Sequence, residues 1–110
     1  MLKDSDFVKI RVAVPLDHAD KIRKVLGEAG AGIQGNYKFA SGSWKQTGRF
    51  LPTRGANPTV GKIGNLEEVP EEVIETLCHV DKVRNVIEAV ENFHPYEEPA
   101  IDVIPRLDVI

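Results

Sequence analysis

The chain has 110 residues, the length of one domain, and 42% of them are hydrophobic, which is enough for one buried core. Its acidic residues outnumber the basic ones and give a formal net charge of -3, a balance that argues against binding along a nucleic-acid backbone. The single cysteine, the lack of an N-terminal secretion signal and the lack of an apolar run of about 18 residues predict a cytoplasmic protein without a membrane span.

The first part of the chain predicts a strand and then a helix. Residues 7–14 alternate between apolar and polar side chains, as in a half-buried strand, and Pro15 ends the alternation. Asp17 is the expected N-cap of the following helix. Apolar residues then recur at helical spacing over residues 19–29, and Gly30 is the expected end of that helix.

The middle of the chain is less periodic. The apolar and aromatic residues of the segment 33–44 predict a strand, and a turn near Gln46 is expected to lead to a short strand over residues 49–51. Residues 53–66 contain several glycines and no period, which predicts a long loop. Residues 72–79 predict another strand, although its two faces are mixed in character.

The last part of the chain predicts a second helix and a final strand. The helix begins near Asp81, carries its apolar residues on one stripe, and ends at His94-Pro95. Residues 101–109 alternate again. Pro99 and Pro105 each remove a backbone donor, which indicates an edge strand or a bulge.

This order of elements predicts an α/β fold of the α+β kind in a single domain, residues 1–110. Two helices that cross one face of an antiparallel sheet form a ferredoxin-like sandwich. The other face of the sheet would then be open, and an exposed apolar face typically marks a surface for a partner.

Two glycine-rich strings resemble nucleotide-binding motifs by their letters only. Residues 30–35 match G-x-G-x-x-G, but they follow a helix and open a strand, whereas the dinucleotide motif does the reverse. Residues 55–63 have the wrong glycine spacing for a P-loop and Ile63 where that motif needs Ser or Thr. The second string is either a solvated connector or a ligand loop flanked by Arg54 and Lys62.

Cys78 and His79 are neighbours on a predicted strand, so their side chains point to opposite faces. Such a pair does not readily chelate one ion. We expect a buried structural cysteine beside an exposed histidine.

The segment from His94 to Pro99 combines an imidazole, a phenol and two carboxylates between two prolines. An imidazole with the carboxylates of Glu97 and Glu98 suits zinc or copper, although another subunit or water must complete the shell. The alternative is structural: Pro95 stops the helix, and a cationic His94 caps its negative end.

Four strings of the sequence also carry a resemblance to a known family. They are residues 94–103 (HPYEEPAIDV), 32–37 (GIQGNY), 48–52 (GRFLP), and 55–58 (GANP) with Gly61. In this order, over nearly the whole chain, they resemble the YqfO family, which occurs alone or inserted in Nif-three-like (NGG-one-interacting-factor-three) proteins. The His-Pro-Tyr-Glu element is also similar to one in CutA, the divalent-cation-tolerance protein.

The resemblance implies a CutA-like and PII-like ferredoxin fold that assembles as a homotrimer, and it does not imply an enzyme. The flanking halves that carry the dinuclear metal ligands of Nif-three-like proteins are not among these 110 residues. Ala40 stands where many relatives have cysteine, which removes one thiol ligand. Of the CutA motif, only the histidine and one glutamate map here, onto His94 and either Glu97 or Glu98.

Two functions remain open at this point, together with a purely structural assembly domain. The first is a small trimeric binding or regulatory module that senses a divalent ion (zinc or copper) or a small ligand at a subunit cleft. The second is a small hydrolase that uses His94 with Glu97 or Glu98 as acid and base, for which no nucleophile is evident. The expected metal ligands are His94, Glu97 and Glu98, and the expected ligand-binding residues are Tyr37, Arg54, Asn57, Lys62 and Tyr96.

Overall fold

The computed structural model describes all residues from Met1 to Ile110 and contains four strands and two helices. In chain order they are β1 (Leu2–Pro15), α1 (Ala19–Ala29), β2 (Gly42–Phe50), β3 (Glu67–His79), α2 (Val83–Phe93) and β4 (Ile101–Val109). The 3-10 turns η1 (Leu16–His18) and η2 (Val80–Lys82) lead into the two helices.

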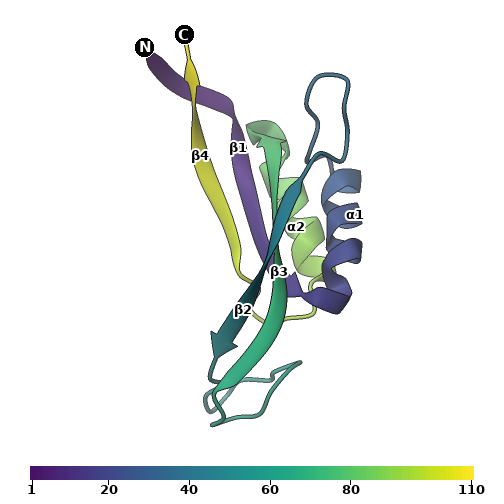
Figure 1. Ribbon diagram of the computed structural model, residues 1–110, viewed down its shortest axis with the longest axis vertical. Helices are drawn as coiled ribbons and strands as arrows, with labels where there is room; N and C mark the ends of the chain where they lie inside the picture. The colour runs from purple at the N-terminus through teal and green to yellow at the C-terminus, as the bar shows by residue number, and fades with distance from the viewer.

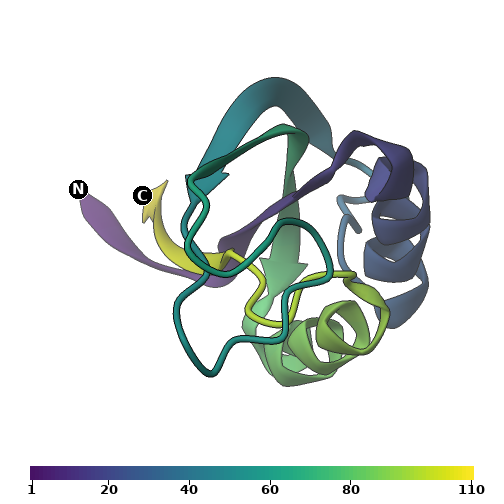
Figure 2. The same cartoon turned by 90° about the horizontal axis from the view of Figure 1, so that it is seen from below.

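The strands form one antiparallel sheet in the order β2-β3-β1-β4 (Figure 1). Both helices lie on the same side of this curled sheet, as Figure 2 shows from below. The arrangement is the predicted ferredoxin-like α+β sandwich. The molecule is elongated, with extents of 50 × 28 × 23 Å, and the first and last residues lie side by side at one end (Figure 1).

The core lies between the sheet and the helices because the apolar residues of β1 and β3 alternate in phase. Val8 pairs with Cys78 and Val12 with Ile74, so these side chains share the face that the helices cover. Eleven buried residues make up this cluster: Ile10, Val12, Val14, Ala19, Ile22, Leu26, Ala31, Ile74, Cys78, Val86 and Val90. Burial of Cys78 agrees with the expectation of a structural cysteine.

The face of the sheet away from the helices is mixed in character. Arg11 forms an ion pair of 2.7 Å with Glu75, and its guanidinium lies 5.2 Å from the ring centroid of Trp44. The Trp44 ring is still 45% exposed. This open face therefore presents both charge and apolar surface to whatever approaches it.

The predicted strand over residues 33–44 is wrong in its first part. Residues 34–37 form a tight turn closed by two backbone hydrogen bonds between Gln34 and Tyr37. Gly35 and Phe39 both have φ of 57°, in the left-handed region that strands do not use. The Phe39 ring packs against α1 at Gly27, in the space that a Cβ at that position would fill. The aromatic residue thus packs on a helix and does not belong to a strand.

The predicted turn near Gln46 is also wrong. β2 runs without interruption from Gly42 to Phe50, and each of its residues pairs with β3 in a constant register. Only residues 42–44 of the first predicted strand and residues 49–50 of the second thus belong to this one edge strand. β3 likewise begins earlier than predicted, at Glu67.

Asp17 does not cap the first helix as predicted. It lies within η1, and its carboxylate contacts the ring of His18 at 2.9 Å, whereas no side chain caps the N-terminus of α1. The end of α1 agrees with the prediction, because Gly30 adopts a left-handed φ of 111° there.

β4 is an edge strand, as its prolines indicated. Its pairing with β1 also contains an irregularity between Asp4 and Val8, and Pro105 pairs with Val8 where the regular register begins again. Neither helix of the molecule has the length and apolar character needed to cross a membrane.

Candidate functional site

The chain after α2 crosses one end of the sheet, and His94 fixes it there. His94 is 7% exposed. Its Nε2 lies 2.7 Å from the carbonyl oxygen of Ala13, and its Nδ1 accepts a hydrogen bond from the backbone N–H of Tyr96 at 3.0 Å. A carbonyl can only accept, so Nε2 carries the hydrogen and Nδ1 is the bare nitrogen of a neutral imidazole.

The charge of His94 corrects the helix-cap prediction. Burial lowers the pKa of His94 below its ordinary value of 6.5, although the Ala13 carbonyl and Glu71 act in the opposite direction. The ring bonds to β1 and to Tyr96, and only the backbone N–H of His94 continues the helix, to Val90. A neutral, buried imidazole does not act as a cation at the helix end.

Tyr96 and Glu71 form the centre of a second group of contacts. The Tyr96 hydroxyl donates to Oε2 of Glu71 at 2.7 Å, and the side-chain amide of Gln46 donates to Oε1 at 3.0 Å. Glu71 is only 5% exposed. Burial, and then the nearby Glu71 carboxylate, raise the pKa of Tyr96 well above its usual value, so the phenol remains the donor.

Gly48 makes room for this carboxylate. Gln46 is directly opposite Glu71 in the β2–β3 ladder, so the two side chains lie on the same face of the sheet. Gly48 is two residues further along β2 and therefore lies on that face as well. A Cβ at position 48 would overlap the carboxylate of Glu71. The absence of a side chain at this position therefore lets Glu71 lie across β2.

The loop between β2 and β3, residues 51–66, lies beside the segment 94–98. The Thr59 hydroxyl donates to the carbonyl oxygen of Pro95 at 2.6 Å, and the backbone N–H of Asn57 donates to Oε1 of Glu97 at 3.1 Å. These two bonds connect regions of the chain that are some 36 to 40 residues apart in sequence.

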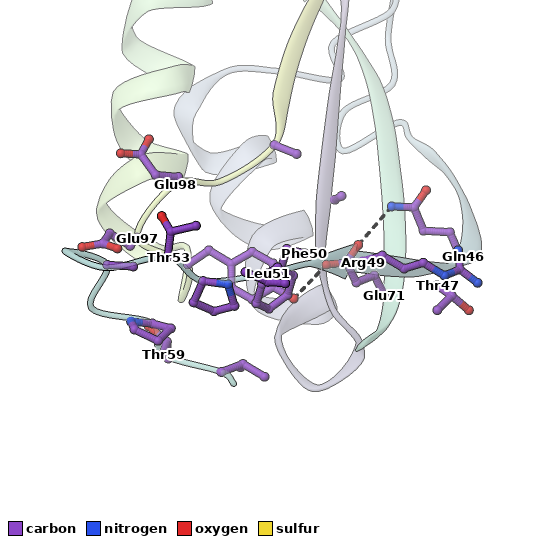
Figure 3. A pocket seen from close by; sticks show the side chains of 18 residues that line it. Gln46, Thr47, Arg49, Phe50, Leu51, Thr53, Thr59, Glu71, Glu97 and Glu98 are labelled. Atoms are coloured by element: carbon purple, nitrogen blue, oxygen red, sulfur yellow. Dashed lines mark hydrogen bonds between the residues drawn. The ribbon is translucent and has the colours of Figure 1, made fainter. Parts of the chain in front are cut away.

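A cleft of about 590 Å³ lies between β2, this loop and the segment 94–98. Its lining combines polar and apolar residues, three acidic residues and one basic residue: Ala13, Gln46–Pro52, Thr53, Ala56, Pro58–Val60, Glu71, Tyr96, Glu97, Glu98 and Ala100. Figure 3 shows Glu71 and Gln46 toward one end of the cleft, and Glu97 and Glu98 toward the other. The volume is in the range of sites that bind small molecules.

The structure brings together some of the residues predicted from sequence. Tyr96, Glu97 and Glu98 line the cleft, and Asn57 reaches its rim through its backbone. Arg54 and Lys62 belong to the same loop but are not part of the lining. Tyr37 is 76% exposed and lies in the α1–β2 connection, which is far from the β2–β3 loop along the long axis of the molecule (Figure 1). It is not part of the cleft lining.

Sequence reasoning missed most of the cleft lining, including Glu71, Gln46 and Phe50. Glu71 and Gln46 meet through strand pairing, and the Phe50 ring packs edge-on against Tyr96 with the centroids 5.9 Å apart. The one available signal was the frequency of glutamates in β3, and it does not distinguish Glu71 from Glu67, Glu68, Glu72 and Glu75. That signal does not reveal the partners, which come from β2 and from the segment after α2.

The three expected metal ligands do not fit a metal centre within one chain. Both ring nitrogens of His94 are engaged in hydrogen bonds, and one oxygen of Glu97 accepts from Asn57. No group of three histidine, cysteine or acidic side chains is placed to hold one ion. Coordination by His94 would require its ring to give up a backbone partner.

Comparison with known proteins agrees with this architecture. No family model matches the chain. The chain is 46% identical over 97 residues to the GTP cyclohydrolase 1 type 2 homolog of Halalkalibacterium halodurans. The aligned residues are 88% of this chain and 26% of the relative. The crystal structure of a Bacillus cereus protein related to NIF3 superposes with a TM-score of 0.79 and 42% identity, over 96% of this chain and 26% of the other.

A third comparison concerns the fold alone. The periplasmic divalent cation tolerance protein CutA from Archaeoglobus fulgidus has a TM-score of 0.66 and 22% identity, over 91% of this chain and 83% of that protein. The fold is thus the ferredoxin-like fold of the CutA proteins. The chain corresponds in sequence and fold to a YqfO-like domain of Nif-three-like (NIF3) proteins, and it spans about a quarter of the length of the relatives it matches there.

Proposed function

We propose that this domain is a small-ligand binding module and that its binding site is the cleft between β2, the loop 51–66 and the segment 94–98. The observation that carries the proposal is the meeting of these three regions around one cavity, with Tyr96 and Glu71 joined at its floor. A cavity of this size with a few placed polar groups is the usual form of a small-molecule site.

We further propose that the domain acts as a homotrimer, with the ligand cleft close to a subunit boundary. The open sheet face and the exposed Trp44 ring support self-association, and the number three rests on the resemblance to CutA and PII proteins. Light scattering tests this directly: we expect three times the chain mass of 12.2 kDa, and a monomer at micromolar concentration would reject the trimer.

Sensing of a divalent ion is the less favoured form of the proposal. The CutA protein named above is a divalent cation tolerance protein, and Glu97 and Glu98 offer carboxylates at one end of the cleft. The engaged imidazole of His94 argues against this reading. It argues equally against a hydrolase in which His94 moves protons, because neither of its ring nitrogens is free.

The binding site is tested by nuclear magnetic resonance on the ¹⁵N-labelled chain. Small aromatic probes that are cationic, neutral or anionic, inorganic phosphate, and zinc are titrated separately. We expect at least one probe to shift the amide signals of residues 46–60 and 96–98 in a saturable way. Shifts confined to other surfaces, or no shifts with any probe, would overturn the proposed site.

A further inference from the structure

We infer that the cleft selects a planar organic cation, such as an amidinium, a guanidinium or a protonated amino-heterocycle. This inference rests on the proposed function and names its ligand class. It starts from the charges of the lining, which contains the carboxylates of Glu71, Glu97 and Glu98 and one guanidinium, that of Arg49. Arg49 is itself paired with Glu68 at 3.8 Å, so the cleft has an excess of negative charge.

Glu71 is a buried carboxylate without a cationic partner. The ion pairs that lysine and arginine form in this chain involve other acidic residues. Its only partners are the neutral donors of Tyr96 and Gln46, one on each oxygen. An ionised carboxylate can accept about four hydrogen bonds, so each oxygen retains one free acceptor position.

A cation in the cleft would compensate this charge. A buried carboxylate is unfavourable until it is paired and hydrogen-bonded. An amidinium or guanidinium presents two parallel N–H groups in one plane, which is the geometry that a carboxylate accepts best. Glu71 lies on the lining with both oxygens held in place by Tyr96 and Gln46, so its orientation is set before a ligand arrives.

Two aromatic rings beside Glu71 favour a planar ligand. Phe50 and Tyr96 are both in the lining, with their centroids 5.9 Å apart and their planes at 65°. The face of an aromatic ring attracts a cation, and a flat ligand also gains apolar contact with it. Carboxylate and rings together suit a flat cation better than a metal ion or an aliphatic amine.

The loop 51–66 does not provide the alternative, an anion site. Its basic residues Arg54 and Lys62 do not line the cleft. Three of the loop's backbone N–H groups are already used, since Ala56 donates to Thr53, Asn57 to Glu97 and Gly64 to Pro52. A phosphate in the cleft would therefore meet the carboxylates of Glu71, Glu97 and Glu98, with Arg49 as the one cationic side chain of the lining.

Benzamidine, benzamide and benzoate test the inference, because they share one ring and differ in charge. Each is titrated into the ¹⁵N-labelled chain at constant ionic strength. We expect benzamidine to bind at residues 46–60 and 96–98 about tenfold more tightly than benzamide, as charge-assisted hydrogen bonds require. Benzoate should cause no shift there.

Two variants and one matched control locate the effect. Glu71→Gln keeps the shape and removes the charge, and should abolish the preference for benzamidine over benzamide. Phe50→Leu leaves Glu71 in place and should weaken benzamidine severalfold. Glu88→Gln makes the same change of charge on the exposed surface of α2, outside the cleft, and should leave binding unchanged.

The outcomes separate the inference from the proposed function. Saturable binding of benzoate or inorganic phosphate in the cleft, or equal affinity for benzamidine and benzamide, overturns the cation inference and leaves the binding module intact. If no probe perturbs the cleft residues, the module itself is wrong. If Glu71→Gln fails to fold, Phe50→Leu and the comparison of the three probes on the unmodified chain still decide the question.

Discussion

Tyr96 donates its hydroxyl hydrogen to Oε2 of Glu71 across 2.7 Å, and this bond joins the segment after α2 to β3. Glu71 retains Gln46 as its other donor. Two donors on one buried carboxylate stabilise it at a position where no lysine or arginine does so. The bond therefore serves both the floor of the cleft and the stability of the domain.

Removal of this hydroxyl should destabilise the fold. In Tyr96→Phe the ring contact with Phe50 can persist, but the buried carboxylate loses a donor, which should lower the free energy of unfolding by about 1–3 kcal/mol. Urea unfolding measures it. Tyr37→Phe is the matched control, because Tyr37 is 76% exposed and should show little change. Equal effects of the two changes would contradict the role of the Glu71 bond.

Acid should destabilise the chain through His94. The folded pKa of His94 is lowered, and in the unfolded chain it titrates near 6.5, so the unfolded state binds more protons as the pH falls. The contribution of His94 to the free energy of unfolding is thus fully present above pH of about 6.5, and it decreases as the pH falls toward the folded pKa. Glu71 and His18 also act on this titration, in opposite directions.

The measurement is unfolding free energy between pH of about 7.5 and 5.5, where most carboxylates stay ionised. The free energy of unfolding of the unmodified chain should decrease as the pH falls over this interval, and that of His94→Gln should decrease less. At the upper pH this variant should be less stable than the unmodified chain by about 1–3 kcal/mol. His79→Gln, at a half-exposed histidine, serves as the control. A gain of stability on acidification would contradict this prediction and would support the interpretation of His94 as a cationic helix cap.

A methyl group at position 48 should disturb Glu71. Gly48→Ala places a Cβ where the carboxylate lies, and we expect a loss of about 1–3 kcal/mol from overpacking. Gly42→Ala lies on the same strand with open space around its Cβ, so it should change stability by no more than about 0.5 kcal/mol. If removal of the carboxylate in Glu71→Ala does not reduce the effect of Gly48→Ala, the two residues are not coupled.

The loop 51–66 should be the first site of trypsin cleavage, after Arg54 or Lys62. The loop is held by the bond between Thr59 and Pro95, so Thr59→Val should speed this cleavage severalfold. Thr47→Val changes an exposed residue of β2 and should not. Mass spectrometry of early fragments identifies the sites, and early cuts within α1 or α2 would contradict the described fold.

Zinc should bind weakly, and the His94 side chain should contribute little to its affinity. Coordination would break a bond to Ala13 or to the N–H of Tyr96, so His94→Ala should leave the zinc dissociation constant within about threefold. Glu97→Gln and Glu98→Gln test the carboxylates separately. A large loss of affinity in His94→Ala, with binding that weakens below pH of about 6.5, would instead support His94 as a ligand.

Periodicity was sufficient to predict both helices, the alternating central strand β1 and the edge strand β4. The two helices and β1 bury a continuous apolar stripe or face, whereas β4 alternates without burying any residue in this chain. Such patterns depend on residues close together in sequence. The error at residues 33–41 has a different origin. Tyr37 and Phe39 look like strand residues by type, but positive φ at Gly35 and Phe39 folds the segment into turns that cover α1.

The site was predictable only in pieces. The segments 53–66 and 94–99 stood out by their own composition, but their contact depends on two single hydrogen bonds across the fold. Glu71 had no local signature, because its partners are a cross-strand amide and a tyrosine 25 residues further along the chain. The cationic helix cap expected of His94 is absent because burial lowers the pKa of its ring, and because the ring bonds to Ala13 and Tyr96 instead of the end of α2.

The two ends of the chain lie side by side, with the N–H of Ile110 bonded to the carbonyl oxygen of Met1 at 3.0 Å. A pulling force applied to these two residues therefore acts across the β1–β4 ladder, in the direction of its hydrogen bonds. Such a force loads the bonds one after another, beginning at the Leu2–Val109 pair, so the strands separate as a zipper does. The irregular stretch between Asp4 and Val8 divides this opening into two stages, and the second must disrupt the regular pairing that holds β4 to the core.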